Sequence, residues 1–138
     1  SLYDRQNGIL IAGEAAGVCV DGAVRMSAPP PVRLEATLSS IDRLISLGPE
    51  TLCYAHFGGY GDAVASLRLA KSKLLDWHGV VRRAAREGRT PEEILGVLKR
   101  KDADLDYLDV LNPDAYIREH DMLINSIKGL GQSARQDG

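Results

Sequence analysis

The stretch that decides the fold is Asn7-Gly8-Ile9-Leu10-Ile11-Ala12-Gly13-Glu14-Ala15-Ala16-Gly17, or NGILIAGEAAG. Its apolar run, residues 9–12, stands between glycines, which is typical of a buried strand. Residues 13–31 follow no helical period and end in a run of prolines, so we expect a loop there, with a short strand at 18–20. The stretch therefore predicts a point at which the chain leaves a sheet.

A helix and a second strand follow this loop. Residues 32–47 repeat apolar side chains at spacings of three and four, which predicts an amphipathic helix, and Gly48-Pro49 is a strong stop signal. Residues 51–55 form a second apolar run, which ends at His56, and residues 57–61 predict a tight turn before an N-cap at Asp62. The order of strand, loop, helix and strand predicts an α/β fold.

The rest of the chain is predicted to be helical. One helix runs from Asp62 to Gly88, and Thr90-Pro91 starts another, with Glu93 completing a capping box. Residues 101–112 are expected to connect to a last helix from Pro113, with the chain fraying after Gly129. The predicted inward-facing residues of the first and last of these helices are Leu67, Ala70, Leu74, Trp77, Val81 and Ala84, and Tyr116, Ile117, Leu123, Ile124 and Ile127.

Composition excludes several classes of protein. The chain has 138 residues and a net charge of −2, with 44% hydrophobic and 5% aromatic residues, so we expect no nucleic-acid partner. No apolar run approaches the roughly 20 residues that span a bilayer, and the first residues do not resemble a targeting signal. We interpret Cys19 and Cys53 as reduced thiols in a cytosolic (cytoplasmic) protein, with a metal-bound or reactive cysteine as the alternative.

Two polar residues occupy parallel positions in this pattern. Glu14 follows the first predicted strand and His56 ends the second. If the strands are neighbours, both side chains project from the same edge of the sheet, where α/β folds gather ligands. A carboxylate and an imidazole suit zinc, iron or manganese, although a surface glutamate and a hydrogen-bonded structural histidine are the plainer interpretation. Tyr60 is a candidate to donate to a substrate oxygen, with a packed tyrosine as the alternative.

The same residues resemble the metallo-β-lactamase-fold metallohydrolases. NGILIAGEAAG is similar to the segment in which an apolar strand of that family runs into Gly-Asp. Residues 34–56 resemble the next helix and strand, in which the last histidine is followed by glycine, as in LGPETLCYAHFG at residues 47–58. The resemblance implies the C-terminal half of an αββα sandwich over residues 1–88 and a helical C-terminal extension over 89–138. It implies that Glu14 stands where the family has an aspartate that bridges two metals, and that His56 is the last metal-binding histidine. One or two ions, zinc or else iron or manganese, are the implied cofactors.

The chain also departs from the family. The signature His-x-His-x-Asp-His is absent, and the histidines are His56, His78 and His120. We therefore expect a fragment of a metal-dependent hydrolase that attacks an ester, thioester, lactone, amide or phosphodiester bond in a small-molecule substrate. No catalytic residue is assigned, and the sequence leaves open whether the chain itself is an enzyme. The alternative is a non-catalytic α/β interaction module with a decayed metal site, and in either case a homo-oligomer is expected.

Other polar residues have plainer interpretations. His78 is expected at the edge of an apolar stripe and His120 on a solvated helix face. Asp102, Asp104 and Asp106 resemble the start of a calcium loop, but residues 107 and 113 lack the glycine and glutamate that the loop requires, so we reject that site. A basic patch at residues 82–86 is expected to be a hydrated helix face.

Overall fold

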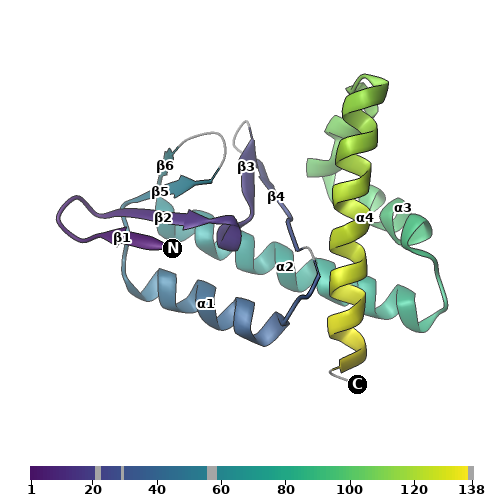
Figure 1. Ribbon diagram of the computed structural model, residues 1–138, viewed down its shortest axis with the longest axis horizontal. Coiled ribbons are helices and arrows are strands. Elements are labelled where there is room, and N and C mark those ends of the chain that lie inside the picture. The colour runs from purple at the N-terminus through teal and green to yellow at the C-terminus, as the bar shows by residue number, and fades with distance from the viewer. Residues whose placement is uncertain (21–22, 29, 56–58, 137–138) are drawn as a thin grey trace. The chain divides into compact units, whose positions relative to one another are not determined.

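The computed structural model describes residues 1–20, 23–28, 30–55 and 59–136. They form an α/β fold with small sheets and long helices, as the sequence predicts (Figure 1). The chain divides into two compact units. The first consists of Ser1–Met26 and Arg33–Leu74, and the second of Ser27–Val32 and Leu75–Gly138. The division falls inside a long helix, and the domain boundary near residue 88 stays a prediction.

The first unit is built on a mixed four-stranded sheet of order β1-β2-β5-β6. Its strands are β1 (Leu2–Asp4), β2 (Ile9–Gly13), β5 (Thr51–Tyr54) and β6 (Gly59–Gly61). The helix α1 (Leu34–Ser46) connects β2 to the parallel strand β5. Strands β3 (Val18–Val20) and β4 (Ala23–Arg25) form a separate antiparallel pair.

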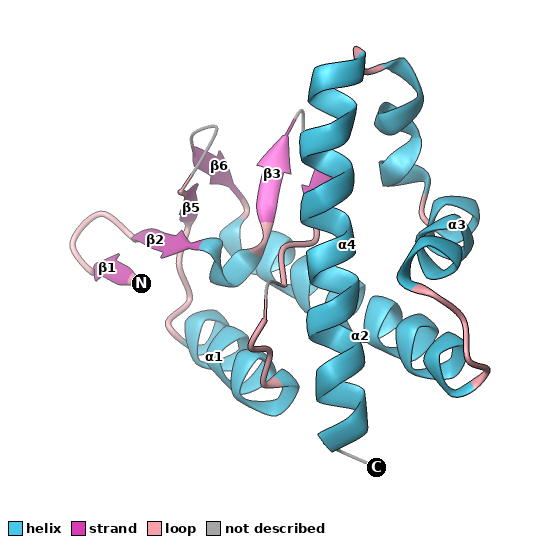
Figure 2. Ribbon diagram, turned by 45° about the vertical axis from the view of Figure 1, so that its right-hand side comes forward, coloured by secondary structure: helices cyan, strands magenta, loops and turns pink. Residues whose placement is uncertain are grey.

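The four-stranded sheet buries one face. Leu10, Ala12, Leu52 and Tyr54 are buried, and they alternate with residues that are more exposed because successive side chains of a strand point to opposite faces. In Figures 1 and 2, α1 and the first part of α2 (Ala63–Arg86) lie on the same side of this sheet. On α1, Leu34, Ile41 and Leu44 are buried, which confirms the face that the spacing predicts.

The second unit is helical. It contains the end of α2, α3 (Pro91–Lys101), the 3₁₀ segment η2 (Ala103–Val110) and α4 (Pro113–Gln136), and α3 and α4 lie side by side in Figure 2. The capping box is confirmed: the Glu93 N–H donates to Oγ1 of Thr90 over 3.3 Å, and the Thr90 N–H donates to Oε2 of Glu93 over 2.8 Å. The stripe predicted on α2 is buried along its whole length.

Two expectations for α4 are wrong. The chain does not fray after Gly129, because the helix continues to Gln136 and buries Leu130, Ser133 and Ala134. Tyr116 and Ile117 do not face inward either: Ile117 is 57% exposed, while Leu123 and Ile127 are buried as expected. The last turns of α4 thus contribute buried side chains to the core, whereas its first turn does not.

No helix in the described ranges is both long and apolar enough to cross a bilayer.

Candidate metal site

Strands β2 and β5 lie side by side and run parallel. Ile9 pairs with Thr51, Leu10 with Leu52 and Ile11 with Cys53, and the register then shifts so that Gly13 pairs with Tyr54. This irregularity leaves Ala12 as an extra residue near the carboxyl end of β2, two residues before Glu14. Bulges of this kind re-aim side chains and are frequent beside functional sites. The two strands that the candidate ligands follow are therefore neighbours, as the sequence requires.

Glu14 opens a single 3₁₀ turn, η1 (Glu14–Ala16), between two glycines in conformations that other residues rarely adopt. Gly13 has φ 62° and Gly17 has φ 78°, and the Gly17 N–H donates to the Glu14 carbonyl oxygen over 3.0 Å. A Cβ at Gly17 would also lie 2.8 Å from the Arg25 carbonyl oxygen. The turn therefore holds Glu14, which is exposed, just beyond the end of β2.

The other predicted site residues are described only in part. His56 lies outside the described residues, which stop at Ala55, the first residue after β5. The backbone of Tyr60 lies in β6 and pairs with Leu52, but its side chain is not described. The structure thus brings the ends of both strands to the same edge, and the joint ligation by Glu14 and His56 stays a prediction.

The donor set fits a metal ion in kind. Carboxylate and imidazole are both ligands of zinc, iron and manganese, whereas zinc takes about four ligands and the chain offers two candidates at this edge. Within the described ranges no three His, Cys, Asp or Glu side chains gather closely enough to hold an ion.

Comparison with protein-family models, curated proteins and solved structures returned no match. The metallo-β-lactamase resemblance therefore rests on the residue pattern alone, and what it implies about fold and activity stays a prediction. The pairing of β2 with β5 is the part of that pattern that the structure describes.

The remaining candidate residues have structural roles. Asp102 accepts the Trp77 Nε1–H over 2.9 Å and the Asp104 N–H over 3.0 Å, so it joins the end of α3 to η2 and to α2. His78 is buried on α2, and Cys19 and Cys53 are both free thiols. None of these residues is part of a described metal cluster.

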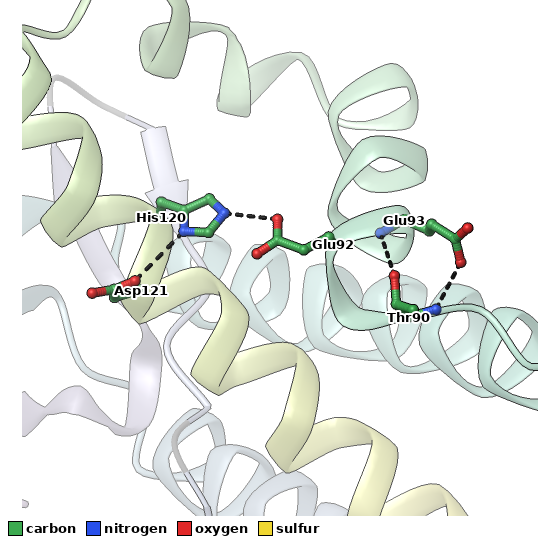
Figure 3. A network of polar contacts seen from close by, with 5 residues as sticks. All are labelled: Thr90, Glu92, Glu93, His120 and Asp121. Carbon is green, nitrogen blue, oxygen red and sulfur yellow. Dashed lines mark hydrogen bonds and ion pairs between the residues drawn. The ribbon is translucent and has the colours of Figure 1, made fainter.

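His120 is not on a solvated face, contrary to the sequence expectation. Its Nε2 lies 2.8 Å from Oε2 of Glu92 on α3, and its Nδ1 lies 3.5 Å from Oδ1 of Asp121 (Figure 3). Its ring also stacks on Tyr116, with centroids 5.7 Å apart. The side chain is 21% exposed. The sequence gives no local signal for the contact between Glu92 and His120, because the two residues lie on different helices. His120 therefore links α3 to α4.

This link predicts a pH-dependent contribution to stability. The hydrogen bond to Glu92 is the main cause of the raised pKa of His120, and Asp121 adds to it. A pKa raised above the unfolded value of about 6.5 gives stability that is complete below that pH and lost as the pH rises through the folded pKa. Because Glu92 is largely exposed, the effect should be no more than about 0.5 kcal/mol.

The measurement is an NMR titration of the His120 ring nitrogens. We expect Glu92→Gln to lower the pKa of His120 toward its ordinary value, and the control Asp76→Asn, an exposed carboxylate on α2, to leave it unchanged. Equal titration curves for the wild type and Glu92→Gln would show that the link carries no electrostatic stabilisation.

Proposed function

We propose that this chain is part of a metal-dependent hydrolase of the metallo-β-lactamase superfamily. The parallel, adjacent pairing of β2 and β5 carries the proposal, because it places the residues after both strands at the same edge of the sheet. In this proposal residues 1–88 form the C-terminal half of an αββα sandwich, and residues 89–138 form its helical extension.

The proposed roles follow from the chemistry of the side chains. Glu14 supplies a carboxylate ligand and His56 an imidazole ligand, and Tyr60 donates a hydrogen bond to a substrate oxygen. When bound, zinc, iron or manganese supplies an activated water for attack on an ester, thioester, lactone, amide or phosphodiester bond. Since two ligands hold an ion weakly, the chain alone is expected to bind metal with low affinity and to give no measurable turnover.

The proposed site has a glutamate, Glu14, at the position where the family has an aspartate. The additional methylene shifts the carboxylate by about 1.5 Å. The bulge at the end of β2 and the turn at Gly13 both alter the path of the backbone at this point, and they support a ligand arrangement adapted to the longer side chain.

Replacing Glu14 tests the proposal. We expect Glu14→Gln, which keeps the shape of the side chain and removes its charge, to weaken Zn²⁺ binding by at least about tenfold, the lower limit of what even an outer-shell partner contributes. Glu14→Asp should retain binding, because it restores the family's residue type. Competition with a chromophoric chelator measures both affinities.

The control is Glu50→Gln, an exposed carboxylate directly before β5. Because β2 and β5 run parallel, Glu50 lies at the end of the sheet opposite to Glu14. If Glu50→Gln and Glu14→Gln lower the affinity equally, the effect is one of net charge and Glu14 is not a ligand.

The second candidate function is a non-catalytic module that associates with another copy of itself. One observation favours it: exposed apolar side chains lie next to one another on the face of the sheet opposite the buried one. Leu2 and Ile11 pair across β1 and β2 on this face and are 68% and 46% exposed, and Cys53 lies beside Ile11. Exposed apolar patches of this kind mark interaction surfaces.

Self-association through this face predicts that the double variant Leu2→Glu/Ile11→Glu is monomeric, whereas the wild type forms a larger species. Light scattering after size exclusion measures the mass of each. The matched control, Leu69→Glu/Leu75→Glu, places the same charges on exposed leucines of α2 and should leave the mass unchanged. A monomeric wild type would count against the module.

A further inference from the structure

One face of α2 in the second unit concentrates positive charge without negative partners. Gly79, Arg82, Arg83 and Arg86 are spaced at three, four and seven residues, so they share this face. In the described part of the chain, no carboxylate pairs with any of the three arginines. Glu87, at the edge of the same face, is engaged by Arg89, whose Nε lies 3.1 Å from Oε2 of Glu87.

Arg82 gives the second, independent observation. Its Nε is shielded from solvent and has no hydrogen-bond partner among the described residues. Shielded donors without partners are rare, because a charged group that loses water without gaining an acceptor is costly. The attraction of cations to the C-terminal end of a helix accounts for Arg83 and Arg86 in the last turns, but it does not provide an acceptor for this N–H.

The face also has room for a ligand. Gly79, Arg82, Arg83, Arg86 and Glu87 line an open depression on the helix surface. A Cβ at Gly79 would meet nothing within 4 Å, so the missing side chain leaves the helix surface open at that point. Guanidinium groups are suited to phosphate, which they bind through paired N–H donors.

We propose that Gly79, Arg82, Arg83 and Arg86 form a binding site for a small soluble ligand that carries a diphosphate. The three guanidinium groups provide more donors than one phosphate accepts. This site lies on a different element from Glu14 and stands independently of the proposed hydrolase function.

Isothermal titration of the full chain with inorganic pyrophosphate, at constant ionic strength in potassium chloride, tests the site. We expect saturable binding of pyrophosphate to one site and weaker binding of monophosphate. The variant Arg82→Ala/Arg83→Ala/Arg86→Ala should lose at least about tenfold in affinity, because each charge-assisted hydrogen bond to phosphate adds substantially to the binding free energy. The control Arg68→Ala/Arg118→Ala/Arg135→Ala removes the same charge from exposed arginines elsewhere and should bind like the wild type.

Two further measurements keep the test decisive if the triple variant is unstable. Gly79→Leu fills the depression at a helical position and should abolish binding while the helix is retained. In the wild type, the NMR signal of the Arg82 Nε–H should shift as pyrophosphate is added. Absence of saturable binding, equal losses in both triple variants, or binding of an acidic peptide but not of pyrophosphate would overturn the proposal.

Discussion

Replacing Gly129 with alanine is expected to destabilise the protein by about 3 kcal/mol or more, the upper end of what overpacking costs. Gly129 lies on the buried side of α4, where the segment Ser27–Val32 crosses the helix. An added Cβ would overlap the carbonyl oxygen of Ala28 and would lie 2.7 Å from Cγ2 of Val32 and 3.2 Å from the nitrogen of Pro30.

The segment has little freedom to move away from such a Cβ. The Ala28 N–H donates to Oγ of the buried Ser126, one turn before Gly129, over 3.0 Å, so the backbone is tied to the helix beside the clash. Alanine favours a helix over glycine by about 1 kcal/mol, which offsets only part of the cost. Thermal unfolding should therefore shift down by roughly 10 °C.

The control for this variant is Gly131→Ala on the same helix. A Cβ there would meet only Cγ1 of Val81, at 3.8 Å, an ordinary contact. We expect no loss, or a gain of up to about 1 kcal/mol from helix propensity. If both variants unfold at the same temperature, α4 does not pack on residues 27–32 as described.

The second large effect is expected from Leu67→Ala on α2. Leu67 is 0% exposed and lies in the middle of the buried stripe in the first unit, between Ala63 and Ala70. Since these neighbours are small, they cannot fill the space that the leucine leaves. Loss of the side chain should lower the free energy of unfolding by about 3 kcal/mol. This value lies within the range of roughly 2–5 kcal/mol that is usual for Leu→Ala in a protein core.

Leu69→Ala is the matched control, because Leu69 belongs to the same helix but is 47% exposed. Its cost should stay within about 0.5 kcal/mol. Urea unfolding of both variants measures the difference, which is meaningful where the denaturant slope is unchanged. Similar losses for both would mean that the buried stripe of α2 is placed on the wrong face.

The regular helices could be predicted because their signals are local. The spacing of apolar residues along α1 and α2 and the capping box of Thr90 and Glu93 depend only on neighbouring residues, and the structure confirms them. Strands β2 and β5 were likewise predicted from their apolar runs. Their pairing was a conditional inference from the α/β order, and the register confirms it.

The features that sequence reasoning missed depend on contacts between distant residues. Strands β1, β4 and β6 each have three residues, which is too short for a periodic signal in the sequence. They are strands because they pair with neighbours, such as Leu2 with Ile11 and Tyr60 with Leu52. The end of α4 contains glycine and polar residues, which is why the sequence predicted fraying there. The helix is ordered instead because Ser126 accepts a hydrogen bond from the Ala28 N–H and because Gly129 leaves room for residues 28–32 to pack on it. Small residues carry no periodic apolar signal.

The candidate site was predictable only in its framework. The sequence placed Glu14 after one strand and His56 after the other, and the structure describes the parallel strands, the bulge and the glycine turn that lead to this edge. The face formed by Arg82, Arg83 and Arg86 was predicted as a hydrated surface, since the shielding of one Nε atom is visible only in three dimensions.

Titration of the full chain with Co²⁺, followed by the NMR signals of the His56 ring and the Glu14 side chain, asks directly whether these two groups reach one ion. Both sets of signals should change together along a single binding curve, and Glu14→Gln should move the His56 curve to at least about tenfold higher metal concentration. A His56 curve that is identical in the wild type and in Glu14→Gln would mean that the two side chains do not share a site.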